Sequence, residues 1–340
     1  MNTQALETIA RTIVQSGKGI LAADESTPTI QKRFAAIEVE STEENRRAYR
    51  ELLFTTQGIE AFISGVIMFD ETIRQSTSDD IPFPQHLAEK GVLPGIKVDK
   101  GANNLAGFDG EKITEGLDGL RQRLVEYREM GARFAKWRAV IPIGHEYPTR
   151  FGLEANAHAL ARYAALCQEA GLVPIVEPEV LMDGDHDIRR CRDVTAETLK
   201  RVYAALFEHC VFLEGTLLKP NMVVSGNTYP IQAGPEEVAE TTMACFRQVV
   251  PAAVPGIVFL SGGQHSIQAT ENLNAINAMG KQPWELSFSF GRALQEDALK
   301  AWQGRSTNKQ KAQLALYHRA QCNSMARRGA YTGLMEEKAF

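Results

Sequence analysis

The sequence predicts a single-domain (β/α)8 TIM barrel, the α/β fold in which eight parallel strands close into a cylinder inside a ring of helices. Two observations lead to this prediction: short apolar runs alternate with polar or helical stretches, and charged residues repeatedly end the apolar runs. A length of 340 residues suits one barrel, because such barrels routinely exceed about 250 residues. We expect one domain over residues 1–340, with a short C-terminal tail from about residue 329 to residue 340.

Eight apolar runs mark the candidate strands. Each run is short, and helical or polar sequence separates it from the next, as expected for strands joined by helical crossovers. In chain order the runs are GILAAD near residue 20, GVIMFD near 65, LPGIKVD near 93, RFAKWR near 133, VPIVEPE near 173, TLLKPNM near 216, GIVFLSGG near 256 and LSFSFGR near 286.

The segments between the runs predict helices. Apolar residues recur every three or four positions from residue 113 to residue 127, which predicts a helix there. A helix is also predicted over residues 156–170, ending at Gly171, and another begins at Pro235, which two acidic residues follow. A two-domain doubly wound fold is the alternative, but the G-x-G-x-x-G turn that usually marks it is absent from the sequence.

Charge and composition narrow the possible partners. The chain has a net charge of -5 and a pI of about 5.9, with no long run of lysine and arginine, so nucleic acid is not an expected partner. No segment approaches the roughly 20 consecutive apolar residues that span a bilayer, and the N-terminal stretch is amphipathic rather than a signal peptide. We expect a cytoplasmic protein with no membrane partner.

The cysteines and histidines form no recognisable redox or metal motif. Five scattered cysteines lack a C-x-x-C pair, which is typical of free thiols in a reducing compartment. The seven histidines show no H-E-x-x-H or similar ligand spacing, and a polar loop explains the nearest candidate, GDHD around His186. We expect no metal and no cofactor.

Polar residues at the ends of the candidate strands are the first place to look for chemistry, because barrels carry their active sites at the carboxyl ends of the strands. Residues two apart, such as Lys136 and Arg138, also share one face of their strand. The residues at or near strand ends are Asp24, Asp70, Lys97, Asp99, Lys136, Arg138, Glu177, Glu179, Lys219, Ser261 and Ser289.

Lys219 is the candidate nucleophile, and nearby carboxylates are candidates for proton transfer. Burial among apolar neighbours and positive charge from Lys136 would favour the neutral amine that attacks a carbonyl carbon. Glu177 and Glu179 share a strand face, which suits proton transfer beside a carbonyl. Simpler interpretations also stand: Lys219 could extend to solvent, the glutamates could form structural ion pairs, and Asp24 could cap the following helix.

The end of the seventh predicted strand is a candidate phosphate site. Ser261, Gly262 and Gly263 lie where barrels often bind phosphate through backbone N–H groups, and Arg292 could add a bidentate contact. An ordinary tight turn and a surface ion pair are the alternatives. An acidic chain that binds a bisphosphate needs concentrated positive charge, for which the candidates are Lys32, Arg33, Arg46, Lys97, Lys136, Arg138 and Arg292.

Long segments of the sequence resemble class I fructose-1,6-bisphosphate aldolases and occur in that family's order. They are GKGILAADES, TEENRRAYRELL, GIKVDKG, FAKWRAVI, VEPEVLMDGDHD, LEGTLLKPNM, FLSGGQ, NLNAIN and SFGRALQ. The resemblance covers nearly the whole chain. It implies a metal-independent, homotetrameric lyase of glycolysis and gluconeogenesis, whose substrate is a phosphorylated ketose.

The resemblance also implies a role for each candidate residue. Lys219 would form the Schiff base, Glu177 would assist dehydration of the carbinolamine, and Asp24 would take the C4-hydroxyl proton. Lys136 would keep the charges beside them in order, and Glu179 would support the network. The implied substrate-binding residues are Ser26, Arg33, Arg46, Lys97 and Arg138, together with Ser261, Gly262, Gly263 and Arg292 at the C1 phosphate.

Three departures from the family pattern bear on rate and substrate preference rather than on imine chemistry. The chain ends in EEKAF, with Phe340 where animal members carry a tyrosine that takes part in turnover. Pro28 and Thr29 replace a common Gly-Ser pair, and Phe290 stands where tyrosine is common.

Three other functions share parts of this pattern. A transaldolase or a pyruvate-dependent lyase would use the same lysine chemistry on another donor, although Ser261 and Arg292 favour a bisphosphate. A barrel that only binds its ligand would keep the same residues without turnover. A metal-dependent aldolase would lose activity in the presence of a chelator.

Overall fold

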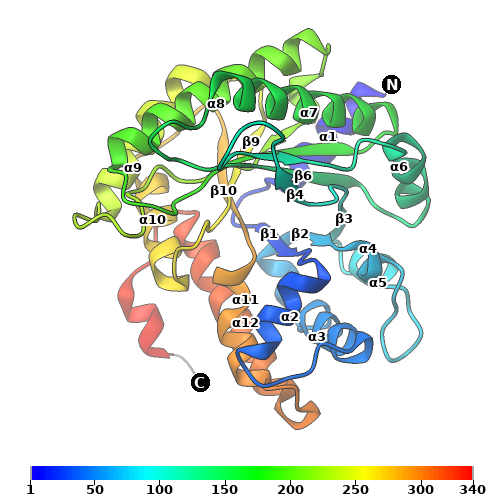
Figure 1. Cartoon of the computed structure of the whole chain (residues 1–340). Coiled ribbons are helices and arrows are strands. Elements are labelled where there is room, and N and C mark those ends of the chain that lie inside the picture. The colour runs from blue at the N-terminus through cyan, green and yellow to red at the C-terminus, as the bar shows by residue number, and fades with distance from the viewer. Residues whose placement is uncertain (1, 339–340) are drawn as a thin grey trace.

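Eight parallel strands close into a barrel in the computed structural model, which describes residues 2–338 (Figure 1). The order around the barrel is β1-β10-β9-β8-β7-β6-β3-β2, and all neighbouring pairs are parallel. Each of the eight predicted apolar runs supplies one strand, so the barrel prediction is confirmed. The strands are β1 Gly19–Ala23, β2 Ile63–Met68, β3 Leu93–Lys97, β6 Phe134–Ile141, β7 Val173–Val180, β8 Leu217–Leu218, β9 Gly256–Phe259 and β10 Glu285–Phe290.

Helices surround the barrel, and helices from the two ends of the chain lie side by side. In Figure 1, α2 and α3 lie beside α11 and α12 on one side, and α7, α8 and α9 cover the other. The predictions over residues 156–170 and from Pro235 are confirmed within α7 and α9. The helices are α1 Thr3–Ile13, α2 Thr27–Ala35, α3 Glu43–Phe54, α4 Asp70–Ile73, α5 Phe83–Glu89, α6 Leu120–Glu129, α7 Arg150–Glu169, α8 Ile188–Glu208, α9 Pro235–Val249, α10 Ser266–Ala278, α11 Arg292–Trp302 and α12 Lys309–Ala326, with 3-10 turns η1 Ile59–Ala61, η2 Leu213–Gly215, η3 Ser306–Asn308 and η4 Gly333–Lys338.

The predicted helix over residues 113–127 begins later than its apolar spacing indicated. Residues 112–114 instead form strand β5 (Lys112–Thr114), which pairs antiparallel with β4 (Ala102–Asn104), and α6 starts at Leu120. Gly116 and Gly119 have φ of 122° and 68°, a region that favours glycine and that a right-handed helix does not contain. The prediction was therefore wrong for residues 113–119.

The barrel interior changes from apolar to charged along the strands. The end of the interior nearest the start of the strands is an apolar cluster that α1 covers. The cluster consists of Leu6, Ala10, Ile13, Val14, Ile20, Ala22, Ile67, Phe134, Val173, Ile175, Leu217 and Val258. Because side chains on a strand alternate, the next inward positions on β6 and β7, and the first position past β8, are Lys136, Glu177 and Lys219. Trp137, the residue after Lys136 on β6, faces outward and packs against Tyr163 of α7, with 5.7 Å between the ring centroids.

Several expectations outside the barrel can also be placed. All five cysteines are free, as predicted; four are buried and Cys210 is exposed. Over residues 2–338 we find no helix with the length and apolar character needed to cross a bilayer. Phe340, at which the sequence departs from the family pattern, lies outside the described residues.

Gly95 provides a test of the packing inside the barrel. A Cβ atom at this position of β3 would lie 2.2 Å from the ring of Phe134, which is fully buried. We expect Gly95→Ala to lower the free energy of unfolding by about 1–3 kcal/mol, measured by urea denaturation. Adding Phe134→Leu to Gly95→Ala should recover part of this loss.

The matched control for that test is Gly333→Ala, because a Cβ at position 333 meets nothing within 4 Å. Its stability should equal that of the wild type. If Gly95→Ala were also as stable as the wild type, the close contact with Phe134 would not limit the size of residue 95.

Candidate active site

The carboxyl ends of the strands open into a charged cavity of about 550 Å³. Seven basic and four acidic side chains line it, so the cavity is locally positive on a chain whose net charge is -5. Thirteen of the fourteen predicted site residues lie on its wall: Asp24, Ser26, Arg33, Lys97, Lys136, Arg138, Glu177, Glu179, Lys219, Ser261, Gly262, Gly263 and Arg292.

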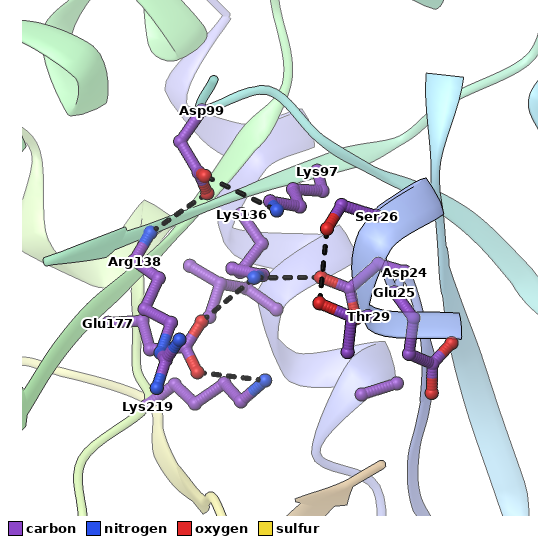
Figure 2. A network of polar contacts seen from close by, with 12 residues as sticks. Asp24, Glu25, Ser26, Thr29, Lys97, Asp99, Lys136, Arg138, Glu177 and Lys219 are labelled. Carbon is purple, nitrogen blue, oxygen red and sulfur yellow. Dashed lines mark hydrogen bonds and ion pairs between the residues drawn. The ribbon is translucent and has the colours of Figure 1, made fainter. Parts of the chain in front are cut away.

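A row of buried charges of alternating sign crosses this cavity (Figure 2). Lys219 Nζ lies 3.2 Å from Glu177 Oε1, and the other oxygen of Glu177 lies 3.2 Å from Lys136 Nζ. Lys136 Nζ in turn lies 2.7 Å from Asp24 Oδ2. Lys219 is 4% exposed and points toward Glu177 rather than to solvent. Asp24 does not cap α2, because it pairs with Lys136 and the N-cap residue of α2 is Ser26.

The backbone around β8 holds Lys219 in this position. Lys219 N donates to Val176 O of β7 at 2.8 Å, and Pro220 O accepts from Leu260 N beyond β9 at 3.0 Å. Pro220 has no N–H of its own, which agrees with β8 ending at Leu218. The side chain of Asn221 then accepts from Val180 N at 3.1 Å. These contacts attach the residues after β8 to both neighbouring strands.

The row of charges shifts the pKa values of its members. Burial alone would raise the pKa of Asp24 and Glu177, but the charges of Lys136 and Lys219 outweigh it and hold both carboxyl pKa values below their usual range. Burial likewise works against a charged Lys136, yet Asp24, Glu177 and Asp99 raise its pKa well above the usual value. Asp24, Glu177 and Lys136 are therefore charged at neutral pH.

The second glutamate has a different environment from the first. Glu179 forms an ion pair with Arg138 of the neighbouring strand β6, which was the structural alternative raised from the sequence. Asp99 joins this group, accepting from Arg138 N at 3.2 Å and lying 3.5 Å from Lys97 Nζ. Only one of the two glutamates thus contacts Lys219.

The rim of the cavity brings together the residues predicted to bind phosphate. Gly262 and Gly263 follow β9 with φ of 54° and 98°, and Arg292 Nη2 donates to Gly263 O at 2.5 Å. The N-terminus of α2 also lies at the cavity, where Ser26 Oγ and Thr29 Oγ1 are 3.1 Å apart. Backbone N–H groups and helix N-termini favour anions, so this rim suits a phosphorylated compound.

Arg46 is the predicted site residue that the fold places elsewhere. It does not line the cavity, and its guanidinium holds Glu71 through two contacts of 2.7 and 2.6 Å. Asp70, also considered from its strand-end position, begins α4 and pairs with Arg74. A position near the end of a strand does not by itself place a side chain in the site.

The cavity also includes residues that were not selected from the sequence. The sequence indicates Lys32 only as a source of positive charge and Ser289 only as a strand-end residue. Thr29, one of the departures from the family pattern, also lines the cavity. Glu25 follows Asp24 and Gly291 precedes Arg292. This adjacency to a predicted site residue is the sequence signal that could have indicated both. The additional lining residues are Ala22, Glu25, Thr29, Lys32, Ala36, Leu260, Ser289 and Gly291.

Fold and cavity together define the class of protein: a (β/α)8 barrel with a buried lysine and carboxylate site beneath a positively charged rim. Residues 5–340 match the family model described as "Fructose-bisphosphate aldolase class-I". The chain belongs to the class I fructose-bisphosphate aldolase family.

Individual relatives agree with this assignment. The chain is 58% identical to a probable fructose-bisphosphate aldolase class 1 of Xanthomonas campestris, over 98% of this chain and 100% of that one. It is 59% identical to the cytoplasmic isozyme of fructose-bisphosphate aldolase of Cicer arietinum, over 93% and 89%. The solved fructose-bisphosphate aldolase of Plasmodium falciparum, in complex with TRAP and a small-molecule inhibitor, superposes with a TM-score of 0.96 at 50% identity, over 97% and 96% of the two chains.

Lys136→Met tests the electrostatic account of the site. The substitution leaves Asp24 and Glu177 buried without the charge they share, so we expect the free energy of unfolding at pH 7 to fall by about 3–5 kcal/mol in urea denaturation. Folding lowers the pKa values of Asp24 and Glu177 below their unfolded values of 3.8 and 4.5, so both carboxylates stabilise the folded chain when the pH is above those unfolded values. This stabilisation is lost as the pH falls through the lower pKa values of the folded chain. The difference between variant and wild type should therefore shrink in acid.

The control for Lys136→Met is Arg150→Met, which breaks an exposed pair with Glu154. It should leave stability unchanged at every pH. A loss in Lys136→Met that did not depend on pH would show that packing, rather than charge, causes it.

Proposed function

We propose that this protein cleaves the C3–C4 bond of fructose 1,6-bisphosphate to dihydroxyacetone phosphate and glyceraldehyde 3-phosphate, and re-forms it, in glycolysis and gluconeogenesis. The observation that carries the proposal is the buried amine of Lys219, 3.2 Å from the carboxylate of Glu177. The named activity of the relatives supports the same substrate.

The first part of the mechanism forms a Schiff base on Lys219. Glu177 takes a proton from the Lys219 ammonium, and the neutral amine attacks C2 of the ketose to give a carbinolamine. Glu177 then returns the proton to the C2 hydroxyl, which leaves as water, and the nitrogen lone pair forms the protonated imine. The proton borrowed by Glu177 is thereby restored, and no other acid is needed.

The second part breaks the carbon–carbon bond. Asp24 accepts the proton of the C4 hydroxyl, the C3–C4 electron pair moves toward the protonated imine to form an enamine, and the aldehyde leaves with C4. Protonation of the enamine at C3 and addition of water to the resulting imine then release dihydroxyacetone phosphate and restore Lys219. The imine takes the place of a metal as the electron acceptor, so the proposal includes no metal and no cofactor in the reaction. Lys136, between Asp24 and Glu177, keeps both carboxylates ionised until the reaction supplies a proton.

The charged rim would bind the two phosphates. We assign Ser261, Gly262, Gly263 and Arg292 to the C1 phosphate, in keeping with the turn after β9 and the contact between Arg292 and Gly263. The remaining substrate contacts are assigned to Ser26, Arg33, Lys97 and Arg138 on the cavity wall, with Glu179 holding Arg138. Arg46 has no place in this assignment, because it pairs with Glu71 outside the cavity.

We extend the proposal to assembly and location. The family resemblance implies a homotetramer, and the exposed apolar side chains of Val125, Phe151 and Phe207 are available for a subunit interface. A molar mass of one chain in light scattering would exclude this. The names of the plant relatives, cytosolic or cytoplasmic, support a cytoplasmic location.

Trapping of the imine tests the proposed nucleophile. Borohydride added with dihydroxyacetone phosphate should reduce the imine and leave a stable adduct, which peptide mapping should locate on Lys219 and not on Lys136. Lys219→Met should form no adduct, and its turnover should fall by roughly a thousandfold or more. An unmodified Lys219 in an active enzyme would end the mechanism.

Cleavage assays with other substrates, trapping of the imine and addition of a chelator together separate the other candidate functions. Cleavage of fructose 6-phosphate or of 2-keto-3-deoxy acids, without cleavage of the bisphosphate, would indicate another Schiff-base enzyme. An adduct without turnover would indicate a binding protein, and inactivation by a chelator would indicate a metal-dependent aldolase.

Arg292 and Arg46 form a matched pair for the phosphate assignment. Arg292→Ala should lower kcat/KM for fructose 1,6-bisphosphate by about 10- to 100-fold, because a hydrogen bond to a charged group contributes about 1.5–3 kcal/mol. Arg46→Ala should leave kcat/KM close to the wild-type value, since Arg46 lies outside the cavity. Equal losses in both variants would contradict the assignment.

A further inference from the structure

A second cluster of reactive side chains lies away from the catalytic cavity. It lies where the C-terminal segment, red in Figure 1, contacts α12. His318 and Cys322 are one turn apart on α12, and therefore on the same face of the helix. Glu336 of η4 completes the group. Cys322 Sγ lies 3.6 Å from His318 Nε2, which lies 3.8 Å from Glu336 Oε2, and all three ligand atoms lie within 4.8 Å of one another.

We propose that His318, Cys322 and Glu336 bind one Zn²⁺ ion, which holds the C-terminal segment against α12. The distance of 3.6 Å between the thiol and the imidazole matches that of a zinc site, whereas Glu336 Oε2, 3.8 Å from His318 Nε2, has to move inward by about 0.5 Å to bind the same ion. With Zn–S of about 2.3 Å and Zn–N of about 2.0–2.1 Å, tetrahedral geometry separates the sulfur and nitrogen ligands by about 3.6 Å. Helix geometry therefore places the imidazole and the thiol at the spacing that one ion requires.

The surroundings of Glu336 leave it able to bind the ion. A carboxylate has about four lone-pair positions. Three are used: Arg319 donates to both oxygens at 2.7 Å, and Tyr331 Oη donates to Oε1 at 2.8 Å. Oε2 is the oxygen nearest His318, and the Cys322 thiol, which also hydrogen-bonds to Glu336, gives up its proton when it binds the ion as a thiolate. Arg319 and Tyr331 thus orient Glu336 in the way that outer-shell groups orient metal ligands.

The charges at this cluster also balance. A thiolate and a carboxylate neutralise the two charges of Zn²⁺, while Arg319 keeps a second carboxylate, Asp297, at 3.7 Å. A set of one sulfur, one nitrogen and one oxygen ligand favours zinc over magnesium or calcium, which prefer oxygen alone. Cys322 is fully buried, whereas the side chains of His318 and Glu336 are 13% and 19% exposed, so an ion can enter from their side.

The role of this ion is structural and independent of the proposed reaction. None of the three residues lines the catalytic cavity. The ion would connect η4 to α12 and so determine how firmly the residues after Tyr331 are held. The sequence pattern, histidine and cysteine four residues apart plus a distant glutamate, is not one that a search for paired histidines detects.

Zinc titration of the full chain, first stripped with a chelator, tests the site. Competition with a chromophoric chelator should give one equivalent of tightly bound Zn²⁺ per chain. Co²⁺ in place of Zn²⁺ should give a thiolate-to-cobalt charge-transfer band. Cys322→Ser should abolish that band, and both Cys322→Ser and His318→Gln should weaken binding of Zn²⁺ by at least about tenfold.

Cys210→Ser is the matched control, because Cys210 is exposed and lies outside the cluster. It should keep both the affinity and the band. Hydrogen exchange over residues 331–338 should slow on addition of Zn²⁺ in the wild type and in Cys210→Ser, and should not change in His318→Gln. His318 is partly exposed, so this variant should fold even if Cys322→Ser does not.

Two results would overturn the proposal. One is the absence of an equivalent of bound Zn²⁺ in the wild type. The other is binding of equal strength in the wild type, Cys322→Ser and His318→Gln, which would place the ion elsewhere on the chain. Loss of aldolase activity in Lys219→Met bears on neither result, so the two proposals fail separately.

Discussion

The site depends on four buried charges, Asp24, Lys136, Glu177 and Lys219, being kept together inside the barrel. Each charge would be very costly to bury alone, and each becomes tolerable only beside a partner of opposite sign. Lys136 contacts both carboxylates, and Glu177 contacts both amines. Closure of the sheet makes this possible, because β1 and β6 are separated by β2 and β3 around the barrel and their side chains meet across its interior. Lys219, the proposed nucleophile, and Glu177, its proposed proton carrier, are thus fixed before substrate arrives.

The rest of the fold isolates this row of charges on one side and opens it on the other. Below it, the apolar interior cluster and α1 exclude water, which strengthens electrostatic interactions at the site. Above it, the turn after β9, the start of α2 and Arg292 provide the positive rim. Side chains on a strand return to the same face every two residues. The inward position after Phe134 is therefore Lys136, and the one after Ile175 is Glu177, so the interior changes from apolar to charged within two residues of each strand. A chain of net negative charge thereby presents a positive cavity to an anionic substrate.

Local pattern was sufficient for much of this architecture. The eight strands were predictable because each is a short apolar run with helical sequence after it, and thirteen of the residues indicated by strand-end position or by the family resemblance line one cavity. The one wrong helix start has a physical cause. Apolar spacing suggested a helix from residue 113, but the positive φ of Gly116 and Gly119 prevents one there. Arg46, which the family resemblance implies for substrate binding, pairs with Glu71 and does not line the cavity. Neither the backbone angle nor the partner is visible in residue spacing.

Residue pattern alone was enough to predict the eight strands along the chain, the charged pairs that share a strand face, and a lysine, a carboxylate pair and a glycine turn at strand ends. These follow from interactions between residues that are close in sequence. The contacts of Glu177 with both amines, the pairing of Glu179 with Arg138, and the cluster of His318, Cys322 and Glu336 become visible only in the folded chain. Such pairings depend on strand register and on how helices pack across the barrel. Two carboxylates two residues apart have the same local pattern, and the neighbour that each one finds gives them different chemistry.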